Sequence, residues 1–200
     1  MKYAIIGFGA VGQALATMFA RKNVEVAVAS TRSPTEIAPQ AKTIGSTIVA
    51  ESLEDAVKAD VILLAVPFWS HRDVAKAAGD WHGKTVIDVT NAYGITPEEL
   101  GHRPSSAVVA EAFTGARLVK AFNHLPAKVL AQDPAVNGGR RVIFVAGDDD
   151  EATGPVVDLV ERLGFAPVRL GALAEGGALV QARGRSWAPL IFQDLVKVSG

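Results

Sequence analysis

Cysteine is absent from this sequence of 200 residues. A chain without thiols cannot form a disulfide framework, a thiolate metal site or a cysteine nucleophile. An excess of one charge is absent as well, because 20 lysines and arginines are balanced by 21 aspartates and glutamates and the net charge is -1. Nucleic acids and anionic membranes are usually bound through a basic stripe, so we expect neither as a partner.

Long hydrophobic runs are also lacking. The most apolar stretch, residues 61–66, is far too short to span a bilayer, which takes about 20 residues, and we expect it to be a buried strand. A strand that begins at the second or third residue leaves no room for a signal peptide, which, with the missing cysteines, favours a cytoplasmic protein. The composition is 49% hydrophobic and the length suits one domain, or one domain with a small appendage.

The most specific pattern lies in the first dozen residues. Residues 1–6 form a short apolar run typical of a strand, the next six read GFGAVG, and residues 13–20 have helical character. Strand, glycine turn and helix in this order are the context that the dinucleotide-binding fingerprint requires. Gly7 would allow the tight turn, Gly9 would let the backbone approach a pyrophosphate, and Gly12 would let the helix pack close to the strand. The N–H groups at the start of the helix would then point at the phosphates.

Continuous apolar runs alternate with amphipathic stretches along the rest of the chain, which is typical of a parallel sheet covered on both faces. We predict strands near residues 2–7, 24–29, 47–50, 61–66, 84–89, 117–122, 141–146 and 166–170. We predict helices near residues 10–22, 52–58, 71–78, 106–113, 126–132 and 149–163. The fold class is therefore α/β, a Rossmann-type doubly wound and mostly parallel sheet with helices on both faces and a short C-terminal helical segment.

The pattern changes after the last predicted strand. Residues 171–177 are predicted as a loop that leads to residues 178–183, and residues 187–197 are predicted as a terminal helix that packs on the sheet or on a partner subunit. Its apolar side chains are Trp187, Leu190, Ile191, Phe192, Leu195 and Val196. We therefore divide the chain into a dinucleotide-binding domain, residues 1–170, and a C-terminal helical extension, residues 171–200, that serves as a cap or a dimer contact.

An acidic run at residues 148–151 precedes the last long helix. Acidic residues stabilise the N-terminus of a helix, so we interpret this run as the cap and first turn of the helix at 152–163. No companion ligands converge on it in the sequence, and we predict no metal site.

The residues after the second strand indicate which dinucleotide is bound. An Asp or Glu usually ends this strand in NAD-binding proteins and takes the ribose hydroxyls. Here the acid is missing, and Ser30, Thr31 and Arg32 stand in its place. These three residues can donate hydrogen bonds to a 2′-phosphate, which a carboxylate would repel. A solvated loop arginine is the alternative, but the fingerprint upstream places this position at the adenosine ribose, so we predict NADP(H) as the cofactor.

The substrate is less clearly indicated. Reduction of a hydroxyacid, imine or ketone needs a positioned proton donor, and the candidates His71, Lys120 and His124 belong to no recognisable acid–base constellation. Only about thirty residues follow the last predicted strand, too few for the long helical substrate domain of the larger dehydrogenases. We therefore assign no catalytic residue. A planar redox acceptor fits better, because hydride transfer to a flavin-like ring depends on stacking and orientation.

The loops that follow the strands must hold such an acceptor against the nicotinamide. They are residues 65–69, 90–94 and 123–127, and they supply aromatic faces, prolines and polar side chains. From them we predict Trp69, Asn123 and His124 as acceptor contacts. Ordinary packing explains Trp69 and its neighbour Phe68 equally well. Trp187 and the turn at 183–185 are further candidates, for which packing and solvation are the favoured explanations.

Together these segments resemble the deazaflavin-coenzyme-dependent NADP oxidoreductases, and also the cytosolic oxidoreductase domain of the STEAP metalloreductases. The resemblance covers essentially the whole chain, and the combination is specific although each segment alone is not. The shared segments are the opening fingerprint, residues 30–32, residues 66–69, residues 119–123 with 126–127, and residues 147–151.

This resemblance implies an NADPH site, hydride transfer to a deazaflavin or flavin stacked over the nicotinamide, and a homodimer in which the C-terminal segment helps to wall the site. The residues that it assigns to NADPH are Phe8, Gly9, Ala10, Val11, Ser30, Arg32, Val66, Pro67, Asn91 and Ala127. The deazaflavin enzymes tend to carry histidine where Asn123 stands, which is closer to the metalloreductase domain, yet the sequence shows no transmembrane haem domain. A ferric chelate reduced through flavin, a small carbonyl compound and a non-catalytic NADP(H)-binding role stay open as alternatives.

Overall fold

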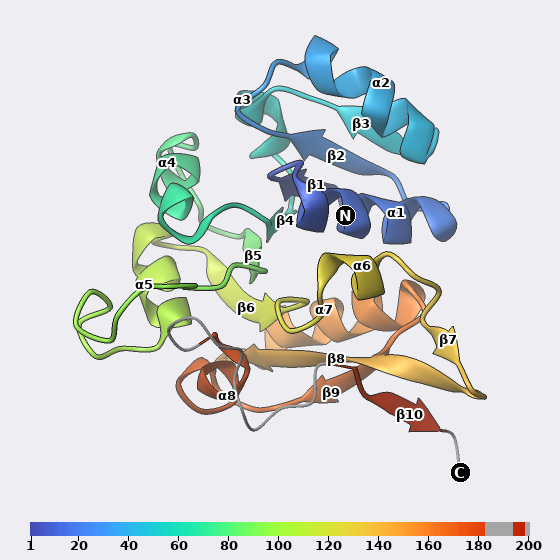
Figure 1. Cartoon of the computed structure of the whole chain (residues 1–200). Helices are drawn as coiled ribbons and strands as arrows, with labels where there is room; N and C mark the ends of the chain where they lie inside the picture. The colour runs from blue at the N-terminus through green and yellow to red at the C-terminus, as the bar shows by residue number, and fades with distance from the viewer. Residues whose placement is uncertain (183–193, 199–200) are drawn as a thin grey trace.

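The strands form one mostly parallel sheet, in the order β10-β8-β6-β5-β4-β1-β2-β3 with β7 and β9 also paired to β8. The computed structural model describes residues 1–182 and 194–198. In Figure 1 the strands follow one another from β3 at the top to β10 at the bottom. Their bounds are β1 Tyr3–Ile6, β2 Val26–Ala29, β3 Ile48–Ala50, β4 Val61–Leu64, β5 Thr85–Asp88, β6 Arg117–Ala121, β7 Ala135–Val136, β8 Gly139–Gly147, β9 Ala166–Arg169 and β10 Val196–Val198.

The helices cover both faces of this sheet. Side chains of α1, α2, α6 and α7 belong to one hydrophobic cluster, and side chains of α3, α4 and α5 belong to the cluster on the other face. Their bounds are α1 Ala10–Arg21, α2 Pro34–Ile44, α3 Leu53–Ala56, α4 His71–Lys76, α5 Ser105–Ala112, α6 Ala127–Leu130, α7 Asp150–Arg162 and α8 Ala178–Val180. The predicted fold class, a doubly wound Rossmann-type sheet, is confirmed.

The parallel part runs from β3 to β6, and its central strands are buried on both faces. All four residues of β4 are buried, and Ile6 of β1 pairs with Leu64 of β4 in register. Such strands need apolar side chains at every position, which is why they appear in the sequence as unbroken apolar runs. β8 then runs antiparallel to β6 and parallel to β9, so the sheet is mixed at this end.

The acidic run at residues 148–151 caps α7, as predicted. The Asp149 carboxylate accepts a hydrogen bond from the Glu151 backbone N–H at 2.8 Å, and Asp148 accepts one from the Leu173 N–H at 2.8 Å. Arg117 pairs with Asp149 at 2.9 Å. Within residues 1–182 and 194–198, no three acidic or histidine side chains gather in a way that could hold a metal ion.

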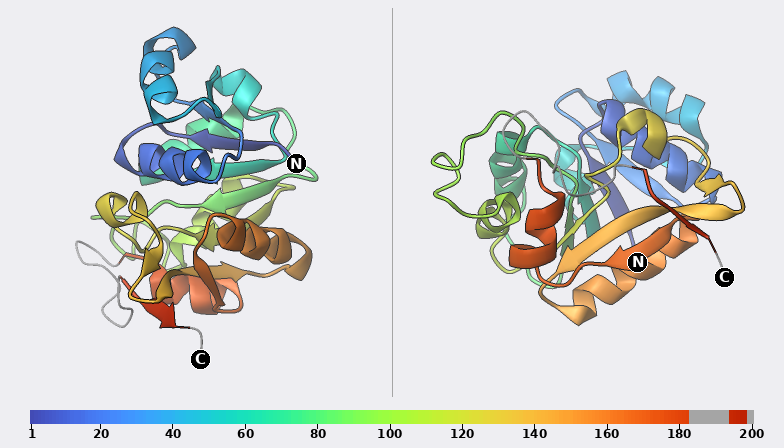
Figure 2. Two further views of the ribbon diagram at one scale, coloured as in Figure 1. Left: turned by 90° about the vertical axis from the view of Figure 1, so that its right-hand side faces the viewer. Right: turned by 60° about the horizontal axis from the view of Figure 1, so that its bottom comes forward.

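Four parts of the fold differ from the sequence-based prediction. α2 was not predicted, β7 and β10 were not predicted, and one π-helical turn at Leu173–Gly177 replaces part of the predicted loop. The predicted terminal helix over 187–197 is wrong at its described end, because Leu195 is not helical and Val196 and Lys197 pair as a strand with Arg141 and Arg140 of β8. β10 lies at the end of the sheet away from α2 (Figure 2).

The other residues on which that helix prediction depended, Trp187, Leu190, Ile191 and Phe192, lie outside the described residues, as does the turn at 183–185. The division into residues 1–170 and 171–200 stays a prediction. None of the described helices combines the length and the apolar character that crossing a bilayer requires.

Candidate dinucleotide-binding site

Two of the three fingerprint glycines are required by the packing of the chain itself. Gly7 has φ +104°, and a Cβ there would lie 2.2 Å from the Ala65 carbonyl oxygen of the neighbouring strand end. A Cβ on Gly12 would lie 1.8 Å from the Gly7 carbonyl oxygen. The first glycine therefore permits the left-handed turn and the third permits the close approach of α1 to β1, as the fingerprint predicts.

Gly9 differs from the other two, because a Cβ built on it would meet no other atom of the chain within 4 Å. It is the N-cap of α1 with φ −83°, a value open to any residue. No side chain caps this helix, and its first turn holds no acidic residue. The N–H groups at the start of α1 thus keep their hydrogen-bonding capacity, and the space in front of Gly9 is open to a ligand.

A cavity of about 470 Å³, which we call the carboxyl-edge hollow, lies at the ends of β1, β2 and β4. β1 and β4 are the neighbours at which the strand order reverses direction along the sheet. Open α/β sheets bind ligands at this switch point. The residues that line the hollow are Ile6, Gly7, Phe8, Gly9, Ser30, Thr31, Arg32, Leu53, Ala65, Val66, Pro67, Ser70, Asp73 and Val74.

Arg32 stands on the wall of this hollow with few contacts. Its backbone N–H donates to Ser30 Oγ at 3.1 Å, and its guanidinium reaches the Phe8 carbonyl at 3.5 Å. Among the described residues it forms no ion pair, and it is exposed. Ser30 and Thr31 also line the hollow, so the three predicted residues converge on one corner.

The nearest carboxylate on α2 is turned toward its own helix end. Glu36 accepts hydrogen bonds from the Ser33 N–H at 2.9 Å and from Ser33 Oγ at 2.6 Å, which completes a capping box. These hydrogen bonds, chiefly that from the Ser33 hydroxyl, lower the pKa of Glu36. Glu36 therefore serves the backbone of α2, and Arg32 is left for a ligand.

The loop after β4 forms one wall of the carboxyl-edge hollow and also contains packed aromatic side chains. Val66 and Pro67 line the hollow, whereas Phe68 is buried and its ring meets that of Trp69 edge-on at 4.9 Å. The Arg72 guanidinium lies 4.2 Å from the centroid of the Trp69 ring. Packing therefore accounts for Phe68, while Trp69 is half-buried and carries a cation on one face.

His71 follows this loop and is fully buried. Its Nδ1–H donates to the Phe68 carbonyl, and its Nε2 has no partner. Burial lowers the pKa of His71, so the ring is held in its neutral form. It belongs to the packing beneath the loop.

Asn91 and Asn123 lie beyond the hollow, after the ends of β5 and β6. Asn91 Nδ2 donates to the Asn123 carbonyl at 2.8 Å, and Asn123 Nδ2 donates to Asn91 Oδ1 at 3.1 Å and to the Val180 carbonyl at 2.8 Å. Phe122, between β6 and Asn123, is buried with φ +63°, a conformation that is rare for an aromatic residue and is found mostly where a function demands it. This turn brings Asn123 to Asn91.

Three other predicted residues have different surroundings. Ala10 and Val11 open α1, next to Gly9. Ala127 opens α6 and packs against the core on the α1 face. His124 is buried against β8, where its Nε2–H donates to the Val142 carbonyl at 3.2 Å and its ring lies 4.8 Å from that of Phe144. Burial lowers the pKa of His124 to about 4, and the structure does not bring this residue to the hollow.

Sequence reasoning missed Asp88 and Thr90, which join Lys120 in a buried polar group. Lys120 Nζ donates to Asp88 Oδ2 at 2.8 Å and to the Thr90 carbonyl at 3.0 Å. A lysine inside an apolar strand could have been recognised as a residue that needs a buried acidic partner. The choice of Asp88 required the register of β5 and β6, which pairs these two residues directly.

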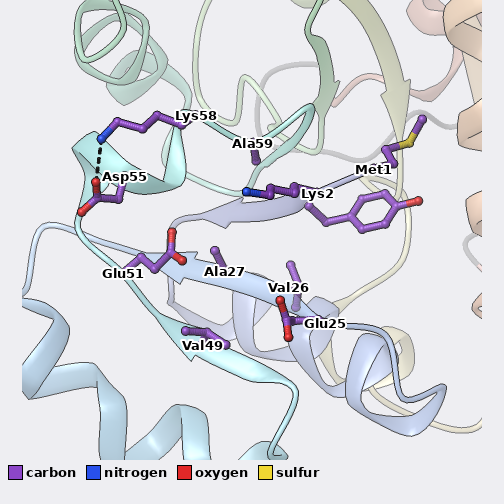
Figure 3. Close-up of a pocket in the computed structure, with 11 residues that line it drawn as sticks. Met1, Lys2, Glu25, Val26, Ala27, Val49, Glu51, Asp55, Lys58 and Ala59 are labelled. Atoms are coloured by element: carbon purple, nitrogen blue, oxygen red, sulfur yellow. Dashed lines mark hydrogen bonds and ion pairs between the residues drawn. The ribbon is translucent and has the colours of Figure 1, made fainter.

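A second cavity, of about 440 Å³, lies at the opposite end of the same strands, and we call it the amino-edge hollow. It lies over the side of the sheet that α3 covers, and α3 has only four residues. Figure 3 shows the lysine and acidic side chains around it, with the Lys58–Asp55 ion pair of 2.7 Å at its edge. Its lining residues are Met1, Lys2, Tyr3, Glu25, Val26, Ala27, Val49, Glu51, Asp55, Lys58 and Ala59.

The chain is similar in sequence to known redox proteins. Residues 2–92 match the family model described as NADP oxidoreductase, coenzyme F420-dependent. The chain is 31% identical over 174 residues to Metalloreductase STEAP3 of Rattus norvegicus, an alignment that covers 86% of this chain and 34% of that protein. The chain thus spans about a third of the length of this relative.

Solved structures agree with the fold. The crystal structure of the hypothetical protein SMa0349 from Sinorhizobium meliloti has a TM-score of 0.89 and 41% identity, and the match covers 98% of this chain and 96% of that one. A putative F420-dependent NADP-reductase from Arthrobacter sp. FB24 has a TM-score of 0.71 and 24% identity, with 89% of each chain covered. The second likeness supports the fold alone.

Proposed function

We propose that the chain belongs to the NADP-dependent oxidoreductase family that the coenzyme F420-dependent model describes, that it binds NADPH in the carboxyl-edge hollow, and that it transfers a hydride between NADP(H) and a deazaflavin or flavin. The family supports the coenzyme class and the redox chemistry. The binding site, the residue roles and the acceptor are our proposals.

The observation that carries the proposal is Arg32. It forms no ion pair among the described residues, residues 30–32 include no acid, and the carboxylates of Glu36 and Asp73 are bound by Ser33 and Lys76. A dinucleotide with a bare ribose is usually held by an acid at this place, whereas a 2′-phosphate needs donors. Ser30, Thr31 and Arg32 supply hydroxyl and guanidinium donors on one wall of the hollow. A charge-assisted hydrogen bond contributes about 1.5–3 kcal/mol, enough to prefer NADPH over NADH roughly 10- to 150-fold.

The other residues of the proposed site would each contact a different part of the coenzyme. The space at Gly9 and the N–H groups of Ala10 and Val11 suit the pyrophosphate, with Phe8 beside them. Val66 and Pro67 form an apolar wall between β1 and β4. Beyond them, the bonded pair Asn91 and Asn123 lies at the proposed nicotinamide end, where Asn123 Oδ1 has no hydrogen-bond partner among the described residues, and Ala127 closes the loop after β6.

When bound, the reduced nicotinamide supplies a hydride to the acceptor ring. The described residues that line the hollow include no histidine or lysine, and its one carboxylate, Asp73, is exposed and pairs with Lys76 at 3.1 Å. Orientation and exclusion of water are therefore the tasks of this chain, as expected for hydride transfer between two planar rings. Trp69, half-buried beside Pro67, and Asn123 are our proposed acceptor contacts.

The experiment mixes the purified protein with NADPH and, in separate reactions, deazaflavin coenzyme F420, FMN, FAD, riboflavin, a ferric chelate or a small carbonyl compound. Loss of the near-ultraviolet absorbance of NADPH reports turnover, and NADH in place of NADPH is the control. Turnover with F420 or a flavin supports the proposal. If the chelate is reduced, and only when flavin is present, the acceptor is a ferric chelate reached through flavin. If only the carbonyl compound is reduced, the acceptor is a small carbonyl compound.

Tight NADPH binding without turnover of any acceptor would instead indicate a non-catalytic binding module. Absence of NADPH binding would overturn the site as well as the activity. We also expect a homodimer, as the resemblance implies, and sedimentation velocity across a range of protein concentrations tests it.

A further inference from the structure

The ends of β5 and β6 hold a buried ion pair that the proposed chemistry does not use. Lys120 and Asp88 are both 0% exposed, and the Nζ–Oδ2 distance is 2.8 Å. Asp88 is the last residue of β5 and Lys120 lies opposite it in β6. Burying two charges costs free energy that their attraction only partly returns, so an apolar pair of similar volume could serve the core as well. Stability alone gives no reason for this pair.

Asp88 and Lys120 form hydrogen bonds with all three polar groups of Thr90, its N–H, its hydroxyl and its carbonyl. Asp88 Oδ1 accepts hydrogen bonds from the Thr90 N–H at 2.9 Å and from Thr90 Oγ1 at 2.7 Å. The Thr90 carbonyl accepts one from Lys120 Nζ at 3.0 Å. Thr90 is itself 2% exposed, so none of these groups is available to water. The two peptide groups on either side of the Thr90 Cα are thus each fixed by one hydrogen bond, the first through its N–H and the second, which leads into Asn91, through its carbonyl.

The position of this group relates it to the coenzyme. Arg32 marks the adenosine end of the proposed site at β2, and the hollow continues over β1 and β4. β5 is the next strand, so a dinucleotide that starts at Arg32 and crosses the switch point reaches the loop at Thr90 and Asn91 with its nicotinamide half. Asn91 is in turn bonded to Asn123 through both polar atoms of its side-chain amide, Nδ2 and Oδ1.

We propose that Lys120 and Asp88 are positioning residues for the nicotinamide half of the coenzyme. They act through Thr90 and Asn91, and they fix the loop against which the nicotinamide lies. This inference rests on the proposed function, since it assumes NADPH in the carboxyl-edge hollow. Displacement of reacting groups by about 1 Å can lower a rate on the order of 100-fold, so a loosened loop affects hydride transfer more than binding.

The test compares Lys120→Met with Lys84→Met. Lys84 also bonds a backbone carbonyl of a neighbouring segment, that of Ala59 at 2.9 Å, but it does so at the amino end of β5. The probes are 2′,5′-ADP, which carries the adenosine half alone, and NADPH. For Lys120→Met we expect unchanged 2′,5′-ADP affinity within about twofold, a kcat lowered on the order of 100-fold and a loss of the fluorescence enhancement of bound NADPH. Lys84→Met should retain all three properties.

Three further variants keep the test decisive if Lys120→Met does not fold. Asp88→Asn with Lys120→Met removes both charges together, so no unpaired charge stays buried. Thr90→Val removes only the hydroxyl donor, and Thr90→Ser restores it. The proposal predicts loss of nicotinamide fluorescence enhancement in the double variant and in Thr90→Val, and recovery in Thr90→Ser.

The outcomes separate the two proposals. If the wild-type protein fails to bind 2′,5′-ADP and NADPH, the proposed function fails and this inference falls with it. If the wild type binds both and the double variant and Thr90→Val match it in kcat and fluorescence, the positioning role is wrong while the proposed function stands. Equal loss of 2′,5′-ADP and NADPH affinity would show a general disturbance of the fold and would also overturn the positioning role.

Discussion

The carboxyl-edge hollow and the amino-edge hollow lie at opposite ends of the same strands and differ little in volume, about 470 against about 440 Å³. Their walls differ in kind. The carboxyl-edge hollow has a glycine turn, an apolar wall and one unpaired cation, Arg32. The amino-edge hollow is lined by both positively and negatively charged side chains, lysines as well as aspartate and glutamates, on the side of the sheet that the short helix α3 covers. Size alone therefore does not identify the site.

The direction of the strands explains the difference. In a parallel sheet with helical crossovers, helices begin near the carboxyl ends of strands, where their free N–H groups attract anions. α1 begins at Gly9 on the carboxyl-edge hollow and ends at Arg21 toward the other end of the sheet. The amino-edge hollow is lined by Asp55 in the first turn of the short helix α3, but the start of that helix is already capped, because Ser52 Oγ accepts a hydrogen bond from the Asp55 N–H at 3.1 Å. Three experiments test how far the two hollows differ in function, and a fourth measures a buried residue outside both as a reference.

The largest effect is expected from the glycines that build the carboxyl-edge hollow. Gly12→Ala places a methyl group 1.8 Å from the Gly7 carbonyl oxygen, so α1 must move, and we expect a loss of about 3 kcal/mol or more in the free energy of unfolding. Gly9→Ala meets nothing in the chain and should leave this free energy within about 0.5 kcal/mol while it weakens NADPH binding. Urea unfolding and NADPH titration measure both. Undiminished NADPH affinity in Gly9→Ala would remove the hollow from the proposed site.

The next effect concerns a residue of neither hollow, His124. Its pKa is about 4 in the folded protein because of burial, against about 6.5 when unfolded, so the unfolded chain binds the proton more readily. Above pH 6.5 the ring is neutral in both states and its protonation does not affect the free energy of unfolding. As the pH falls from 6.5 toward 4, protonation of the unfolded chain lowers this free energy, by about 2 kcal/mol at pH 5 and by about 3 kcal/mol in total. His124→Gln keeps an N–H donor for Val142 and should flatten this part of the pH dependence in urea unfolding. If the free energy of unfolding of His124→Gln depends on pH as that of the wild type does, the lowered pKa of His124 is not the cause of this pH dependence.

A more local effect is expected at the corner of the carboxyl-edge hollow. Arg32→Asp should raise the dissociation constant for NADPH roughly 10- to 150-fold and that for NADH far less, because it replaces a donor to the 2′-phosphate by a charge that repels it. Lys42→Asp changes the net charge by the same amount in the last turn of α2 and is the matched control. Equal weakening of both coenzymes by Arg32→Asp would refute the role of this corner in coenzyme choice.

The smallest effect is expected at the amino-edge hollow. Glu25→Gln and Glu51→Gln alter charged side chains on its wall, and neither residue lines the carboxyl-edge hollow. We expect NADPH affinity within about twofold of the wild type and a free energy of unfolding within about 0.5 kcal/mol. Isothermal titration and urea unfolding measure these values. A clear loss of NADPH affinity would mean that the two ends of the strands are coupled.

The sequence was most informative where structure is local. The eight strands that it predicted are present, and Gly7 and Gly12 have the packing roles that the fingerprint assigns. α2 was missed because Pro39 lies inside it, although the capping pair Ser33 and Glu36 was a visible signal for its start. A proline is tolerated at this position while packing and capping hold the rest of the helix.

Long-range features escaped prediction for a different reason. β10 is three residues long and has strand character only because it pairs with β8, more than fifty residues away. The Asp88–Lys120 pair depends on the register of β5 and β6, and the bond from Asn123 to Val180 spans 57 residues. Such contacts are set by the assembled sheet, so no local pattern announces them. The roles of Gly7 and Gly12 were accordingly easier to predict than the contacts around Asn91 and Asn123.

One structural feature, the central place of β8, has a consequence for how the chain is made. β8 is the shared partner of β6, β7, β9 and β10, whereas the pairings of β1 to β5 with one another all lie within residues 1–88, and β5 keeps its other edge for β6. During synthesis from the N-terminus, those five strands can therefore assemble while the rest of the chain is still being translated. The second half must wait until Gly147 has emerged from the ribosome, so chaperones would meet it as the later and more exposed folding intermediate.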